Sequence, residues 1–107
     1  FEVEIAVAQV GITPDQDQLY RISFDGSVHD QAGFISMGGD SETVGNHMST
    51  NWTTGAGAQE TLKAAVHALY PDTTPDISSL EVATLNRTGD GRRFSRCTAD
   101  EITKLLG

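Results

Sequence analysis

Apolar and polar residues alternate at the start of the chain. Odd positions from 1 to 7 are large and apolar, whereas even positions carry glutamate or alanine. A repeat of two predicts a β-strand with one face on a core and the other face partly in water. The same repeat predicts a second strand over Leu19–Phe24, after a loop at 11–18. The predicted core face of the first strand consists of Phe1, Val3, Ile5 and Val7.

Two further strands are predicted before the repeat changes. Asp25-Gly26 is typical of a tight hairpin turn, because glycine adopts a positive φ without steric cost. The return strand is predicted over Ser27–Gln31. Ala32-Gly33 interrupts it, and the apolar run Phe34–Met37 predicts a short fourth strand that ends at Gly38-Gly39.

A helical repeat begins near position 40. Asp40 or Ser41 is a predicted N-cap, with Glu42 in the first turn, where the helix dipole favours an anion. A second helix is predicted over Ala58–Tyr70 and ends before Pro71. The predicted buried stripes are Val44, Met48 and Trp52 on the first helix, and Leu62, Ala65, Val66 and Leu69 on the second.

The last part of the chain predicts a hairpin followed by a helix. Strands are expected over Leu80–Asn86 and Arg92–Cys97, joined by a turn at 89–91. Thr98-Ala99-Asp100-Glu101 fits a capping box, and the buried stripe of the helix after it consists of Ile102, Leu105 and Leu106. The order is therefore four strands, two helices, two strands and one helix, which predicts an α+β fold with helices packed on sheet.

The charge balance excludes several classes of partner. The formal net charge is −8, so the surface repels phosphate backbones and nucleic-acid binding is disfavoured. The sequence contains neither a membrane-spanning apolar stretch nor a signal peptide, so we expect no membrane partner and a cytoplasmic protein. The single cysteine, Cys97, agrees with a reducing compartment. Because Phe1 already lies in a strand pattern, we expect the chain to be part of a longer protein.

The sequence gives little evidence for a nucleophile or for metal ligands. Cys97 follows Arg96, and a nearby cation favours a thiolate, but the sequence supplies no paired base. We therefore expect Cys97 to be a small buried apolar residue. His29, His47 and His67 lie in three different predicted elements without a metal-binding spacing, so we do not assign them as ligands.

Three other features have structural interpretations. Gly38-Gly39 precedes a helix start, but the acidic residues there would repel a phosphate, so we interpret it as a turn. Asp76 and Ser79 stand three positions apart after the helix pair. Four arginines flank the second hairpin, and we interpret them as a solvated or inter-subunit patch: Arg87, Arg92, Arg93 and Arg96. We assign no catalytic, metal-binding or cofactor-binding residue, and no cofactor.

Five segments, in order along the chain, resemble the 20S proteasome alpha subunits of actinobacteria, in their C-terminal portion. The resemblance fades between positions 46 and 57. The segments are Phe1–Val10, Leu19–Val28, Gly33–Gly39, Ser79–Ala83 and Arg92–Arg96.

This resemblance implies an N-terminal nucleophile hydrolase-like αββα sandwich. Residues 1–107 would be the C-terminal part of one alpha-type domain and would supply later strands of both sheets, the helix pair and the C-terminal helix. It also implies a non-catalytic structural and gating subunit in the heptameric outer ring, acting in ATP-driven protein degradation. Its partners would be other alpha subunits, beta subunits, a ring-shaped ATPase activator and unfolded proteins in transit. The gate and the activator pocket would lie outside this chain.

Two alternatives stay open at the level of sequence. Catalytic beta-type threonine peptidase subunits of this family carry an Asp-x-x-Ser-Gly grouping after the helix pair. Asp76 and Ser79 keep that spacing, but Leu80 stands where the glycine is expected. The continuation Leu80-Glu81-Val82 and the segment Phe34–Gly39 favour the alpha type. The other alternative is a free-standing small binding domain, which would fold as a stable monomer.

Overall fold

The computed structural model describes residues 3–31, 33–88 and 93–107. Its mixture of strands and helices confirms the predicted mixed α/β composition, although the fourth strand is absent from these residues. The predicted turn at 89–91, together with Phe1, Glu2, Ala32 and Arg92, lies outside them. In chain order the elements are β1 (Ile5–Gln9), the 3-10 helix η1 (Pro14–Gln16), β2 (Gln18–Ile22), β3 (Val28–Gln31), α1 (Ser41–Asn51), α2 (Ala58–Leu69), the 3-10 helix η2 (Ile77–Ser79), β4 (Ala83–Leu85), β5 (Phe94–Arg96) and α3 (Ala99–Leu106).

The first three strands form an antiparallel sheet in the order β1-β2-β3. Ile5 stands opposite Ile22, and Ile22 stands opposite Val28, so apolar residues line up across the sheet. The predicted hairpin joins β2 and β3, but its turn is wider than predicted, because it includes Phe24 as well as Asp25 and Gly26. Gly26 has a φ of 87°. Asp25 accepts hydrogen bonds from both the amide and the hydroxyl of Ser27, which holds the turn.

The prediction of a fourth strand over Phe34–Met37 is wrong, because this segment is irregular and packs against α1. A strand needs a neighbour for its backbone groups, and the described residues offer none here. Side chains hold the segment instead. Phe34 meets Trp52 edge-to-face at 5.9 Å between ring centroids, and the hydroxyl of Ser36 donates to the carbonyl of Ser41 at 2.8 Å.

The first predicted helix begins and ends close to its expected bounds, with Asp40 at the N-cap and Trp52 at the C-cap. The Asp40 side chain makes no capping hydrogen bond. On α2 the predicted stripe is partly wrong, because Leu69 is 55% exposed while the unpredicted Ala68 is buried. The helix lies between α1 and α3, and a small residue such as Ala68 permits a close approach.

The second hairpin is shorter than predicted. Regular pairing covers only β4 and β5, with Ala83 opposite Arg96 and Leu85 opposite Phe94. The capping box that starts α3 is confirmed. The Glu101 amide donates to the Thr98 hydroxyl at 3.2 Å, and the Thr98 amide donates to the Glu101 carboxylate at 3.1 Å.

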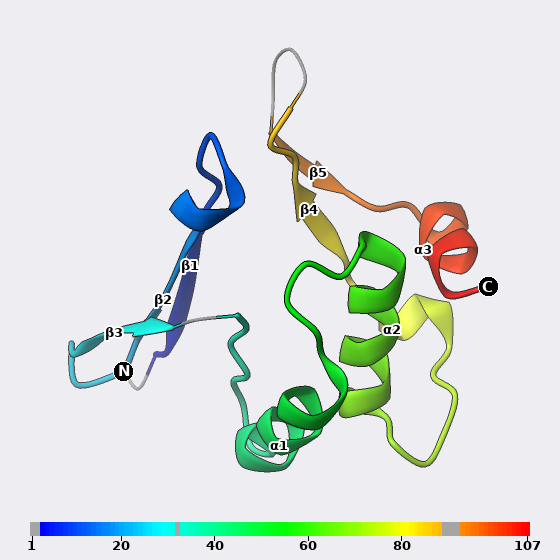
Figure 1. The fold of residues 1–107 in the computed structure, drawn as a ribbon. Coiled ribbons are helices and arrows are strands. Elements are labelled where there is room, and N and C mark those ends of the chain that lie inside the picture. Colours follow the sequence, from blue (N-terminus) through cyan, green and yellow to red (C-terminus); the bar gives the residue numbers. More distant parts are fainter. Residues whose placement is uncertain (1–2, 32, 89–92) are drawn as a thin grey trace.

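The core is small and lies among the three helices. Its buried apolar residues are Met48 of α1, Ala68 of α2 and Ile102 of α3. Figure 1 shows the β1-β2-β3 sheet standing beside the helices, not beneath them. The prediction that Val3, Ile5 and Val7 lie on a core is therefore wrong for the described residues, since all three are more than 40% exposed.

The chain leaves more surface in water than a compact monomer does. Its accessible surface is 7966 Å² at 11.4 kDa, whereas a folded monomer of this mass exposes roughly 5800 Å². Its radius of gyration of 14.5 Å also exceeds the roughly 13 Å expected for a domain of this length. The exposed surface includes large apolar side chains, which are therefore available to contact another protein or another part of the same protein.

Candidate assembly surface

One side of the β1-β2-β3 sheet carries a continuous group of apolar side chains. The pairing register places Ile5 beside Ile22, and Val7 beside Tyr20, on the same side. We use the term apolar face for this group, which consists of Val3, Ile5, Val7, Tyr20, Ile22 and Val28. Val3 is 52% exposed and Val28 is 61% exposed, so water reaches the face from end to end.

This exposure is energetically unfavourable for an isolated chain. Full burial of one large aliphatic side chain stabilises by about 1.5–3 kcal/mol. Apolar surface gathered in one place, unlike scattered single residues, marks a site of interaction. The period of two along β1 is typical of a strand with one side on a core, although no helix of the described residues covers this side.

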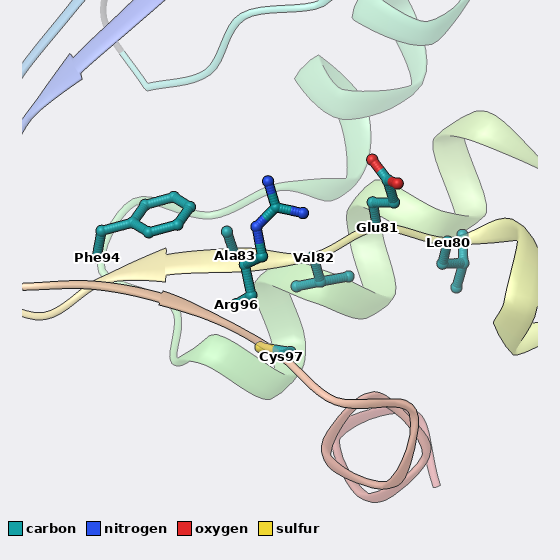
Figure 2. A pocket seen from close by; sticks show the side chains of 7 residues that line it. All are labelled: Leu80, Glu81, Val82, Ala83, Phe94, Arg96 and Cys97. Carbon is teal, nitrogen blue, oxygen red and sulfur yellow. The ribbon is translucent and has the colours of Figure 1, made fainter.

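The β4–β5 hairpin has a second exposed side. Ala83 and Leu85 of β4 share it with Phe94 and Arg96 of β5, and Phe94 is 45% exposed. Beside it lies a shallow cavity of about 330 Å³. Figure 2 shows Glu81, Ala83 and Arg96 pointing to one side of the strands, whereas Leu80 and Val82 point to the other side. Arg96 and Glu81 supply the charged groups of its lining, and the remaining lining residues are Leu80, Val82, Ala83, Phe94 and Cys97. This lining suits a protein contact better than a catalytic centre, because it offers no paired nucleophile and base.

One ion pair ties the two sheets together. Arg87 donates to both carboxylate oxygens of Asp17, at 2.6 and 2.7 Å, and to the Gly11 carbonyl at 2.9 Å. The hydrogen bonds from Arg87 and from the Gly11 amide lower the pKa of Asp17 to about 2. The interpretation of the four arginines as a solvated or inter-subunit patch does not hold for Arg87, because Arg87 pairs with Asp17, 70 positions away within the chain.

The loop before β2 contributes backbone groups to this ion pair. Its tightest point is Gly11, where an added Cβ would lie 2.3 Å from the Cβ of Gln16. Only glycine fits such an approach, so the Gly11 carbonyl and amide can both face the ion pair. A cavity of about 600 Å³ lies beside the loop, between the β1-β2-β3 sheet and the rest of the chain, and its lining includes Leu19, Trp52 and Arg87.

The structure separates most of the residues singled out in the sequence. Cys97 directly follows β5 and is half-buried, whereas the sequence predicted a buried residue. His29 lies on β3, and its ring is 3.1 Å from the Ser27 hydroxyl. His47 and His67, however, lie side by side across α1 and α2, with ring centroids 5.6 Å apart. A single sequence cannot reveal this pairing, because the two positions belong to different helices.

The other singled-out residues serve local structure. Gly38 has a φ of 105° and forms the turn before α1. The Asp76 carbonyl accepts the Ser79 amide at 2.9 Å, so the two residues bracket η2. Arg93 donates to the carbonyl oxygens of Asn86 and Arg87.

The described ranges contain neither a metal-binding cluster of three or more side chains nor a membrane-spanning helix. No three histidine, cysteine or acidic side chains gather there in a way that could hold a metal ion. No helix in these ranges is long and apolar enough to cross a membrane.

Comparison with known proteins identifies the relatives. A proteasome subunit alpha of Renibacterium salmoninarum is 42% identical to the chain over 115 residues, which cover 99% of the chain and 48% of the relative. Those of Salinispora tropica and Kineococcus radiotolerans are 42% and 37% identical, again over 99% of the chain, and 44% and 49% of their lengths are covered. Over nearly its whole length, the chain is similar to proteasome alpha subunits of actinobacteria. No protein-family model matches it.

The resemblance to proteasome alpha subunits seen in the sequence is thus confirmed. The chain spans slightly less than half the length of the curated relatives that it matches. Its resembling segments occupy definite places in the fold. Leu19–Val28 contains most of β2, the glycine turn and the first residue of β3, while Ser79–Ala83 runs from η2 into β4.

Proposed function

We propose that residues 1–107 form the C-terminal part of a non-catalytic alpha-type subunit in the outer ring of a 20S proteasome. The observation that carries this proposal is the identity of 36–42% with proteasome alpha subunits over nearly the whole chain. The exposed apolar face supports it, because a subunit of a large assembly has a use for surface that a monomer must hide. The role is structural and gating, and it acts through protein contacts.

The fold proposed for the whole subunit is an N-terminal nucleophile hydrolase-like αββα sandwich. In such a sandwich two antiparallel sheets stack between layers of helices, and stacked sheets lie about 10 Å apart. The chain contributes one sheet of three strands and one of two. Further strands and helices of the subunit would then cover the apolar face.

The proposed partners follow from the same assignment. They are the other alpha subunits, the beta subunits, a ring-shaped proteasomal ATPase activator and unfolded proteins on their way to degradation in the cytoplasm. We assign no catalytic, cofactor-binding or metal-binding residue to this role, and we place the gate and the activator pocket outside the chain.

The proposal is tested by asking whether the subunit reacts as a threonine peptidase. The protein carrying this chain is purified together with its beta partner and treated with an electrophile that acylates N-terminal threonine. We expect label on the beta partner and none on this chain, by intact mass. Label on this chain, together with a processed N-terminal threonine, would overturn the alpha assignment in favour of a catalytic beta-type subunit.

A further inference from the structure

Two histidines meet where the first two helices pack. His47 of α1 and His67 of α2 have ring centroids 5.6 Å apart and ring planes at 78°. Each directly precedes a core residue, since Met48 is 7% exposed and Ala68 is 3% exposed. Packing of those two neighbours fixes both backbones, so the histidines are presented by rigid elements and not by loops.

The two rings have free bonding capacity. Within residues 3–31, 33–88 and 93–107 no hydrogen bond involves the ring of His47 or of His67, whereas His29 contacts Ser27. His47 is half-buried and His67 is exposed, so ions in solution can reach the pair. Neutral imidazole has one nitrogen with an available lone pair, and two such rings side by side can act as a chelate.

The separation of the rings matches the requirement of a shared ion. A histidine nitrogen binds Zn²⁺ at about 2.0–2.1 Å, which places the centres of two rings on one tetrahedral ion roughly 5–5.5 Å apart. The observed separation of 5.6 Å is close to that range. Because the rings meet edge to face at 78°, a ring has to rotate about its side-chain bonds before both rings present a nitrogen to one ion. No third ligating side chain joins the pair among the described residues, so water would complete the coordination.

The chemistry of the pair selects the class of ion. Imidazole nitrogen suits zinc, copper and nickel, whereas magnesium and calcium prefer oxygen ligands. The net charge of −8 favours the approach of cations. Lys63 lies one turn before His67 on α2, and its positive charge disfavours a cation beside it. We propose that His47 and His67 form a two-histidine site for a transition metal ion, Zn²⁺ in the first instance, that links α1 to α2.

The test is a titration of the chain with ZnCl₂ by calorimetry, with MgCl₂ as the control ion. We expect about one Zn²⁺ per chain, and binding weaker by about tenfold or more in His47→Gln and in His67→Gln, because each ring supplies half of the protein ligands. His29→Gln and Cys97→Ala are the matched controls, since they remove the remaining histidine and the only thiol. Both should bind Zn²⁺ within about twofold of the unaltered chain.

A second measurement needs no substitution. In histidine ring NMR spectra of the unaltered chain, Zn²⁺ should shift the signals of His47 and His67 and leave those of His29 in place. Zinc binding that survives both His47→Gln and His67→Gln, or that shifts only His29, would overturn the proposal. Absence of Zn²⁺ binding to the unaltered chain would overturn it as well.

Discussion

At the scale of single residues, the fold depends on a few contacts that join distant parts of the chain. Asp17 and Arg87 form a bidentate pair, and such a pair is stronger and more directional than a simple contact of opposite charges. Gly11 allows the pair to close by offering both of its backbone groups. None of this could be predicted from one sequence, because Asp17 lies in a loop before β2 and Arg87 lies after β4, 70 positions away.

Replacing Asp17 by asparagine should destabilise the chain in a pH-dependent way. The folded state lowers the pKa of Asp17 to about 2, below the ordinary value of about 3.9. The stabilisation is therefore complete above about pH 4 and is lost as the pH falls towards about 2. Urea unfolding of both proteins should give different midpoints near neutral pH and converging midpoints at acidic pH. Asp72→Asn, in an exposed loop after α2, is the control, and a difference that persists at about pH 2 would contradict the account.

Gly11→Ala should be more disruptive than an ordinary surface substitution. The added Cβ would lie 2.3 Å from the Cβ of Gln16 and 2.9 Å from its carbonyl. Overpacking of this kind costs about 1–3 kcal/mol, read as a lower urea midpoint. Gly39→Ala is the matched control, because nothing lies within 4 Å of its added Cβ. Equal midpoints for the two variants would show that the loop is free to move aside.

At the scale of elements, sequence patterns were reliable where local chemistry decides the outcome. The capping box at Thr98 and the glycine turn after β2 both formed where predicted, because their hydrogen bonds lie within a few residues. The patterns gave wrong predictions where the structure of a segment depends on a neighbouring element. Phe34–Met37 is apolar and strand-like, but it lacks a pairing strand among the described residues. Leu69 continues a helical stripe, but its side of α2 has no partner there.

Thr98→Ala tests the capping box. Removal of an N-cap hydroxyl costs about 1 kcal/mol, because the Glu101 amide then loses its acceptor. The loss should appear as a lower thermal midpoint and lower helical ellipticity. Thr103→Ala makes the same chemical change inside α3, where the hydroxyl only contacts the Ala99 carbonyl, and it should be close to neutral. A Thr98→Ala midpoint as high as that of Thr103→Ala would contradict a capping role.

At the scale of the whole molecule, the decisive feature is surface that the chain does not bury. Its accessible area exceeds that of a compact monomer by roughly 2200 Å², and a stable interface needs only roughly 800 Å² from each partner. The alternation at Val3, Ile5 and Val7 was recognisable in the sequence as a face that needs a cover. The sequence could not say that the cover lies outside the described residues, because an apolar residue is compatible with any partner of suitable shape.

The isolated chain should therefore self-associate through the apolar face. Ile5→Thr combined with Val7→Thr should weaken association by about tenfold or more. Each change lowers the free energy gained from burying apolar surface by about 1–2 kcal/mol. Sedimentation velocity over a range of concentrations measures this. Ala6→Thr, on the opposite side of β1, is the control and should change little. A monomer with a sharp thermal transition at every concentration would instead support a free-standing binding domain.

The central claim is that this chain belongs to a subunit of a ring-shaped protease assembly. The most direct measurement is the mass and shape of the particle obtained when the protein carrying this chain is produced together with its beta partner. Native mass spectrometry and electron microscopy should reveal a ring-sized particle that contains both proteins, with this one in the outer rings. Recovery of the protein alone, with no beta partner and no ring-sized particle, would contradict the account.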